Sequence, residues 1–145
     1  MLRGSLRALV PIGAVLLSVA MAAPALAAAS VTYTDAQRLP GRSSVQLTAD
    51  VTCDAPAGTT SYLTVTLWQG DYTRPNRYLE GQGQIVVTCD GTSHSYSFTA
   101  TTTIFYTDKH FTLGKAFTES TVQYCTTTEC TPIFPLIRQR IHIHG

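Results

Sequence analysis

Hydrophobic and polar residues alternate along most of this chain with the period of two that is typical of β-strands. The clearest example is the run from 45 to 53, in which every second residue is apolar. These residues are Val45, Leu47, Ala49, Val51 and Cys53. Strict alternation of this kind predicts a half-buried strand that carries its cysteine on the core side.

The same pattern predicts further strands, separated by turn residues. They cover residues 61–68, 85–89, 96–100, 116–125 and 137–143, the fourth with less cleanly divided faces, and residues 104–106 continue a strand or begin one. Residues 69–81 are polar and turn-rich, which predicts a loop or a pair of short edge strands. Residues 107–114 predict a polar loop, and Pro132 and Pro135 predict an irregular crossing before the last strand.

One connection carries a strong turn signal of its own. Asp90-Gly91 stands between Ile85, Val87 and Cys89 on one side and the alternating run from Tyr96 on the other. This dipeptide between two strands predicts a β-hairpin.

No window shows sustained helical periodicity, and Thr, Val and Tyr favour strands. About seven or eight short strands, spaced by turns, are typical of a sandwich. The sequence therefore predicts an all-β fold, an antiparallel immunoglobulin-like β-sandwich with two disulfides.

The first 27 residues have a different composition. A basic head with Arg3 and Arg7 precedes an apolar run and a final Ala25-Leu26-Ala27, the pattern of a secretory signal peptide with its cleavage site. We expect residues 1–27 to be removed, residues 28–145 to form a single domain, and the protein to be secreted and extracellular. The mature part has no second apolar stretch long enough to span a membrane.

Charge argues against one large class of partner. Without Arg3 and Arg7, the ten basic residues become eight against nine acidic ones, a formal charge of about −1. Nucleic-acid binding needs clustered Lys and Arg to neutralise phosphates. We therefore expect no nucleic-acid partner.

Four cysteines in an exported chain predict two disulfides rather than a zinc site. Cys125 and Cys130 enclose four residues, which suits a bridge across a turn and leaves Cys53 to pair with Cys89. Zinc sites usually present close cysteine pairs, whereas Cys53 and Cys89 are isolated and far apart.

Two resemblances accompany this interpretation. The segments Thr52-Cys53-Asp54-Ala55-Pro56-Ala57-Gly58 and Val87-Thr88-Cys89-Asp90-Gly91-Thr92, with the C-x₄-C element, resemble small uncharacterised secreted Ig-like proteins of actinobacteria. The Thr-bearing loop from Cys125 to Cys130 is also similar to a loop in the neocarzinostatin-type apoproteins. That second resemblance implies a sandwich that carries an apolar small molecule in a cleft, although the long Cys53–Cys89 span departs from that family.

The best candidate binding residues are aromatic. Tyr62 and Trp68 share the side of their strand opposite to its apolar residues, and Tyr72 and Tyr78 follow in the next polar segment. Flat rings with polar neighbours stack on sugars or on partner side chains. We expect Tyr62, Trp68, Tyr72 and Tyr78 to form an exposed patch, with coverage of the core as the alternative.

Other polar groups give weaker signals. His142 and His144 lie on one side of the last strand, but two ligands are too few for a zinc site. Ser93-His94 and Asp108-Lys109-His110 hold reactive groups as sequence neighbours without a nucleophile motif. We expect no catalytic residues, no metal and no cofactor.

These observations predict a non-catalytic secreted binding domain whose partner is a protein, a glycan or a small molecule. Two alternatives stay open: a carrier of an apolar small molecule, and a protease inhibitor or enzyme. An inhibitor needs a rigid exposed loop, which the segment from Cys125 to Cys130 offers.

Overall fold

The computed structural model describes residues 28–71, 78–103 and 110–145. These residues form seven strands and no helix. The strands are β1 (Ala29–Arg38), β2 (Ser44–Asp54), β3 (Thr60–Gly70), β4 (Tyr78–Val87), β5 (Asp90–Thr102), β6 (Gly114–Cys125) and β7 (Cys130–Ile143). No helix that could cross a membrane occurs within these ranges.

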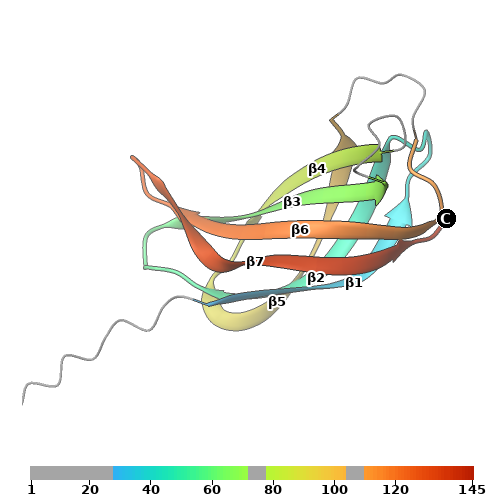
Figure 1. Cartoon of the computed structure of the whole chain (residues 1–145). Coiled ribbons are helices and arrows are strands. Elements are labelled where there is room, and N and C mark those ends of the chain that lie inside the picture. Colours follow the sequence, from blue (N-terminus) through green and yellow to red (C-terminus); the bar gives the residue numbers. More distant parts are fainter. Residues whose placement is uncertain (1–27, 72–77, 104–109) are drawn as a thin grey trace, which may run out of the picture.

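All seven strands belong to one hydrogen-bonded sheet in the order β1-β2-β5-β4-β3-β6-β7. Every neighbouring pair is antiparallel. The sheet curls on itself, so that β2 and β5 pass behind β3, β6 and β7 (Figure 1). The predicted antiparallel all-β fold is confirmed, with the two facing layers supplied by one curled sheet.

The core lies between these layers and follows the alternation of the sequence. The aliphatic residues of β2 and β3 are fully buried. They are Val45, Leu47, Ala49, Val51, Leu63, Val65 and Leu67. Burying a Val or Leu side chain contributes about 1.5–3 kcal/mol, which explains why the period of two dictates which face of each strand turns inward.

The curled sheet closes where β1 meets β7. The backbone N–H of Arg38 donates to the carbonyl of His144 at 2.8 Å, and the N–H of His144 donates to the carbonyl of Ala36 at 3.0 Å. Further along, the side-chain amide of Gln139 accepts from the Tyr33 N–H at 2.9 Å and donates to the Tyr33 carbonyl at 3.1 Å. The amide of Gln139 thus replaces a missing backbone partner for β1.

Tyr33 also ties the two layers together through its ring. Its hydroxyl lies 2.6 Å from Ser120 Oγ on β6, and both residues are buried. Burial raises the pKa of Tyr33 to about 12, although the hydrogen bond to Ser120 acts in the opposite direction. The phenol therefore stays neutral at physiological pH.

Both predicted disulfides are present. Cys53 on β2 is bonded to Cys89, and Cys125 at the end of β6 is bonded to Cys130 at the start of β7. Cys53 is buried, whereas Cys130 is exposed. The first bridge anchors the connection between β4 and β5 to the core, and the second holds the tip of the β6–β7 hairpin.

The predicted hairpin at Asp90-Gly91 is wrong. Strands β4 and β5 pair only through Gly81 and Gln82 with Thr102 and Thr101, far from the turn, and Asp90 pairs with Asp54 of β2 instead. The reason is the Cys53–Cys89 bridge together with a bond from the Ala55 N–H to the Cys89 carbonyl. They draw the chain across to the other layer before the turn closes.

Residues 110–113 form no strand, in agreement with the expected polar loop 107–114, but Phe111 among them is fully buried. Residues 104–109, which include the expected strand 104–106 and the first part of this loop, lie outside the described residues. The segment around Pro132 and Pro135 belongs to β7, where two extra residues bulge between the pairs Ser120–Ile137 and Val122–Ile133. A bulge on an edge strand accepts a proline because no ladder N–H is required there.

Candidate binding face

The sheet has two outward faces of different chemistry. On the layer of β1, β2 and β5 the outward side chains are mostly Ser, Thr and Gln, and several bond to one another. Ser44 Oγ lies 3.1 Å from Thr101 Oγ1, Gln46 Nε2 donates to Ser97 Oγ at 3.1 Å, and Ser95 Oγ donates to Asp50. Several polar side chains on this face are therefore hydrogen-bonded to one another.

The opposite layer presents an aromatic row across four strands. In register, Glu80 of β4 stands beside Trp68 of β3, Trp68 beside Phe117 of β6, and Phe117 beside Arg140 of β7. Directly opposite residues have Cβ atoms about 4.5–5.5 Å apart. The Arg140 guanidinium lies 5.3 Å from the centre of the Phe117 ring, within the range of a cation–π contact.

The next row along the same face is charged. Thr66 of β3 is followed by Glu119 of β6 and Arg138 of β7. Arg138 Nε donates to Glu119 Oε2 at 2.7 Å, and the Arg138 side chain is 72% exposed. An exposed pair of this kind contributes at most about 1 kcal/mol to stability, so its guanidinium is available to a partner.

We call Trp68, Phe117, Glu119, Arg138 and Arg140 the binding face. Phe117 is 46% exposed, unusual for a ring in the middle of a strand. Trp68 is half-buried, and its indole nitrogen is buried without a hydrogen-bond partner in the described part of the chain. An unpaired buried donor costs about 1–3 kcal/mol, so Trp68 is held by its ring contacts rather than by its N–H.

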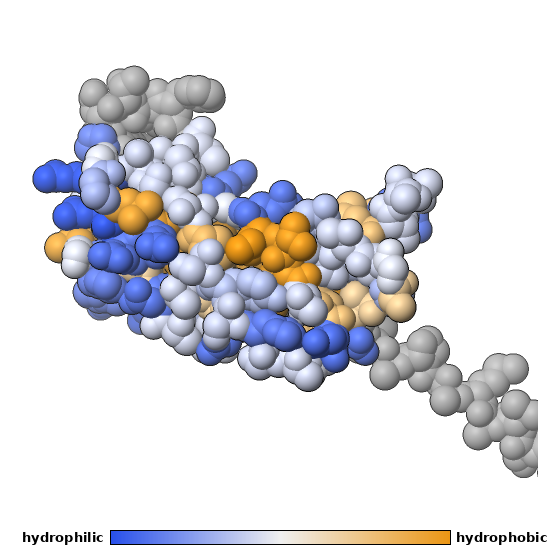
Figure 2. Space-filling model, turned by 180° about the vertical axis from the view of Figure 1, so that it is seen from behind, coloured by the Kyte–Doolittle hydropathy of each residue, from blue (hydrophilic) through white to orange (hydrophobic). Residues whose placement is uncertain are grey.

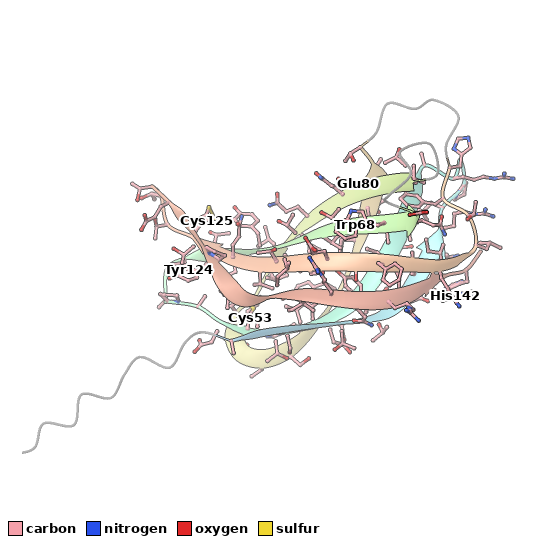
Figure 3. The ribbon with its side chains drawn as sticks, viewed as in Figure 1. Cys53, Trp68, Glu80, Tyr124, Cys125 and His142 are labelled. Atoms are coloured by element: carbon pink, nitrogen blue, oxygen red, sulfur yellow. A yellow bond between two sulfur atoms is a disulfide. The ribbon has the colours of Figure 1, made fainter. Side chains whose placement is uncertain are left out.

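The structure does not bring together the two predicted aromatic residues whose side chains it describes. Tyr62 and Trp68 share the outward side of β3, but six residues of strand place them about 20 Å apart. Tyr72 lies outside the described residues, and for Tyr78 only the backbone, at the start of β4, is described. Figure 3 shows Trp68 and Glu80 close together at the end of the sheet opposite to Tyr124 and Cys125.

Sequence reasoning missed Phe117 as the partner of Trp68. The available signal was that Phe117 directly follows Ala116, which is buried, so that Phe117 lies on the outward face of this Thr-rich strand. The pairing of β3 with β6, 49 positions apart at Trp68 and Phe117, supplied the rest.

Asp90, Thr92 and His94 form a compact cluster at the start of β5. Asp90 Oδ1 accepts from the Thr92 N–H at 2.9 Å and the Thr92 hydroxyl at 2.7 Å, and lies 3.0 Å from His94 Nε2. The bonds from Thr92, followed by the bond from His94, hold the pKa of Asp90 below its usual range.

This cluster does not have the geometry of a catalytic triad. The Thr92 hydroxyl and the Asp90 carboxylate both meet Nε2 of His94, at 3.0 Å each. In a triad the nucleophile and the carboxylate bond to different ring nitrogens. The cluster is a hydrogen-bonded turn.

The two histidines of β7 have separate surroundings. His144 Nε2 lies 2.6 Å from Asp35 Oδ1, and this hydrogen bond raises the pKa of His144. His142 is exposed beside Lys115. Within the described ranges, no group of three or more His, Cys, Asp or Glu residues could hold a metal ion.

The loop from Cys125 to Cys130 is a tight turn. The Thr126 N–H donates to the Glu129 carbonyl at 2.8 Å, and Thr126 Oγ1 accepts from the N–H groups of Thr128 at 3.3 Å and Glu129 at 3.1 Å. All of these residues are exposed. The loop is therefore compact and braced from within.

Among the described residues, shallow hollows at the margins of the sheet include two of moderate size. One, of about 240 Å³, follows the junction of β1 and β7 from Tyr33 to His142. The other, of about 390 Å³, lies between the β2–β3 connection and the end of β4, beside Cys89. Of the binding face, Arg140 alone lines either of these two hollows, at the edge of the first.

The comparisons with known proteins add no family to this description. No protein-family model matches the chain, and no curated protein matches it at a significant level.

Proposed function

We propose that this protein is a non-catalytic secreted domain that binds a partner protein through the binding face. The observation that carries the proposal is the row of Trp68, exposed Phe117 and Arg140. Aromatic residues and arginine are enriched at protein interfaces and dominate their energetics. The outward side chains of β1, β2 and β5 are mostly Ser, Thr and Gln that bond to one another, which supports the aromatic face rather than this one as the binding surface.

The charges indicate the chemistry of the partner. Arg138, Arg140 and His142 point outward in a stripe along β7, with Lys115 beside His142. A matching surface has an apolar centre that covers Phe117 and acidic groups around it. Charges of this kind mainly set orientation and association rate, while the desolvated ring supplies affinity.

The other candidate functions have less support. A carrier of an apolar molecule needs an enclosed cavity, and the two described hollows are shallow. A substrate-like inhibitor needs an extended loop, whereas the turn from Cys125 to Cys130 is closed by its own hydrogen bonds. An enzyme needs convergent groups, and the cluster at His94 has the wrong bonding pattern.

We also propose that the fold is immunoglobulin-like and that the protein acts outside the cell. The support is the strand order: constant-type Ig domains have sheets A-B-E-D and C-F-G, and the order β1-β2-β5-β4-β3-β6-β7 matches it except that β4 pairs mainly with β3 rather than with β5. Two disulfides are compatible with an oxidising, extracellular compartment.

The experiment is differential capture from the extracellular fraction of the native host. Immobilised wild type is compared with Phe117→Ala and Arg140→Glu, and Gln46→Ala on the opposite face is the control. We expect a protein that the wild type and the control retain and both face variants lose, with affinity reduced at least about tenfold in Phe117→Ala.

Purified partner and protein then allow a direct titration. Retention of every captured protein by both face variants would refute the binding face. Turnover of a substrate by the wild type, unchanged in the face variants, would refute the non-catalytic proposal.

A further inference from the structure

Two junctions of the curled sheet have few backbone hydrogen bonds, and they differ in what else joins their strands. At the junction of β1 and β7, backbone bonds, the Gln139 amide and the ion pair of Asp35 with His144 join the strands. At the junction of β4 and β5, the ladder ends after the pair Gln82–Thr101. The rest of β4 pairs only with β3.

The direction of the unpaired backbone groups follows from the last bonds of that ladder. The Thr103 N–H donates to the Glu80 carbonyl at 3.1 Å, so the Glu80 carbonyl points toward β5. Alternate residues of a strand direct their N–H and C=O groups to the same side. Gln84 and Val86 therefore direct theirs toward the open edge, while Ile85 and Val87 direct theirs toward β3.

Just past the last pair of the ladder, β5 still passes close to β4. A Cβ at Gly83 would lie 2.6 Å from the carbonyl oxygen of Thr99, so β5 presses against β4 at this glycine. Beyond it, the Thr88 N–H bonds to the hydroxyl of Tyr96 at 2.7 Å. A side chain rather than a strand spans the junction there.

The open edge also lacks the usual protection against strand pairing. Residues 81–87 contain no charge and no proline, whereas exposed edges normally carry such residues. Val86 is 56% exposed and Ile85 is half-buried. Figure 2 shows apolar surface near the middle of the face seen from behind.

We propose that the β4 edge is a self-association site at which β4 pairs antiparallel with β4 of a second copy of this chain. In a two-fold arrangement centred on Ile85, Gln84 stands opposite Val86 of the second copy. These are the residues whose backbone groups face the edge. Each of the two Gln84–Val86 pairs forms two hydrogen bonds, four in total, and the two Ile85 residues form a close non-hydrogen-bonded pair.

The β4 edge is complementary to itself both in its hydrogen-bonding groups and in its charge. The two-fold axis sets the same neutral segment against itself, so that no like charges oppose each other within residues 81–87. Such an interface is isologous and closes as a dimer. It is also short, so the dimer is weak.

The first measurement is sedimentation equilibrium of the disulfide-bonded protein over about 0.01–1 mM, the range in which a small interface associates. We expect a reversible monomer–dimer equilibrium. Val86→Lys places a charge on the edge without disturbing the core and should abolish it. Gln46→Lys, the same change of charge on the central strand β2, should not.

The second measurement is amide exchange by NMR at both ends of that range. With a Kd of about 0.1 mM, four-fifths of the chains are dimeric at about 1 mM, and exchange at Gln84 and Val86 slows about fivefold. Amides of Ile85 and Val87 should not respond to concentration. A monomer at about 1 mM, a dimer that persists in Val86→Lys, or exchange at Gln84 independent of concentration would each overturn the proposal.

Discussion

Replacing Gln139 with Glu tests whether a single side-chain amide closes the sheet. Glu has nearly the same shape, but a second oxygen replaces the Nε2 group that donates to the Tyr33 carbonyl at 3.1 Å. The acceptor for the Tyr33 N–H at 2.9 Å remains. The substitution therefore removes one donor and sets a carboxylate against a half-buried carbonyl.

The expected magnitude follows from these two bonds. An unsatisfied carbonyl costs about 1–3 kcal/mol, and the stronger bond from the Tyr33 N–H to a charged acceptor offsets about 1 kcal/mol of it. The difference is about 0–2 kcal/mol, so we expect Gln139→Glu to lower the free energy of unfolding by about 1 kcal/mol at neutral pH. Protonation of the introduced carboxyl restores a donor, so the loss should shrink as the pH falls through the pKa of that group.

Urea unfolding of both proteins at about pH 7 and pH 4, with the disulfides intact, measures this effect. Gln84→Glu is the control, because Gln84 donates to Thr64 on an exposed face, and its change should stay within about 0.5 kcal/mol at both pH values. Equal stability of Gln139→Glu and this control would refute the role of the amide. A loss that does not diminish at pH 4 would refute the mechanism.

Three further results are expected. The raised pKa of His144 contributes stability that is complete below about pH 6.5 and is lost as the pH rises through the folded-state value; urea unfolding between about pH 5 and 9 should show this slope, and Asp35→Asn should remove it. Gly83→Ala should lower the free energy of unfolding by at least about 1 kcal/mol, because the added Cβ would meet a backbone oxygen at 2.6 Å; an unchanged melting temperature would contradict this. Mild reductant should open the exposed Cys125–Cys130 bridge before the Cys53–Cys89 bridge, and its loss should lower the free energy of unfolding by about 2 kcal/mol. Mass spectrometry after alkylation gives the order, and earlier opening of Cys53–Cys89 would contradict it.

The alternating pattern determined a large part of this fold without any coordinates. The period of two in β2 and β3 assigned their inward faces because burial of Leu47 or Leu63 outweighs any alternative orientation. The cysteine spacing was sufficient for both disulfides. These features depend on neighbours along the chain or on a choice among three pairings, so the sequence contains them.

Features that depend on which strands meet were not predictable in this way. Strand β1 was not predicted, and its partnership with β7 rests on the amide of Gln139, which no local pattern distinguishes from an exposed glutamine. Gln69 acts similarly: its amide bonds to both the N–H and the carbonyl of Thr112, each at 2.8 Å, in the segment that buries Phe111. Single long-range hydrogen bonds leave no periodic trace in the sequence.

The binding face shows the same division. The sequence alone predicted that Trp68 points outward. Trp68 follows the inward residue Leu67, and successive side chains of a strand alternate between faces. That Phe117 and Arg140 stand beside it was decided by the register of β3, β6 and β7. Register is set by the packing of the whole curled sheet, so only the tertiary structure could assemble this row.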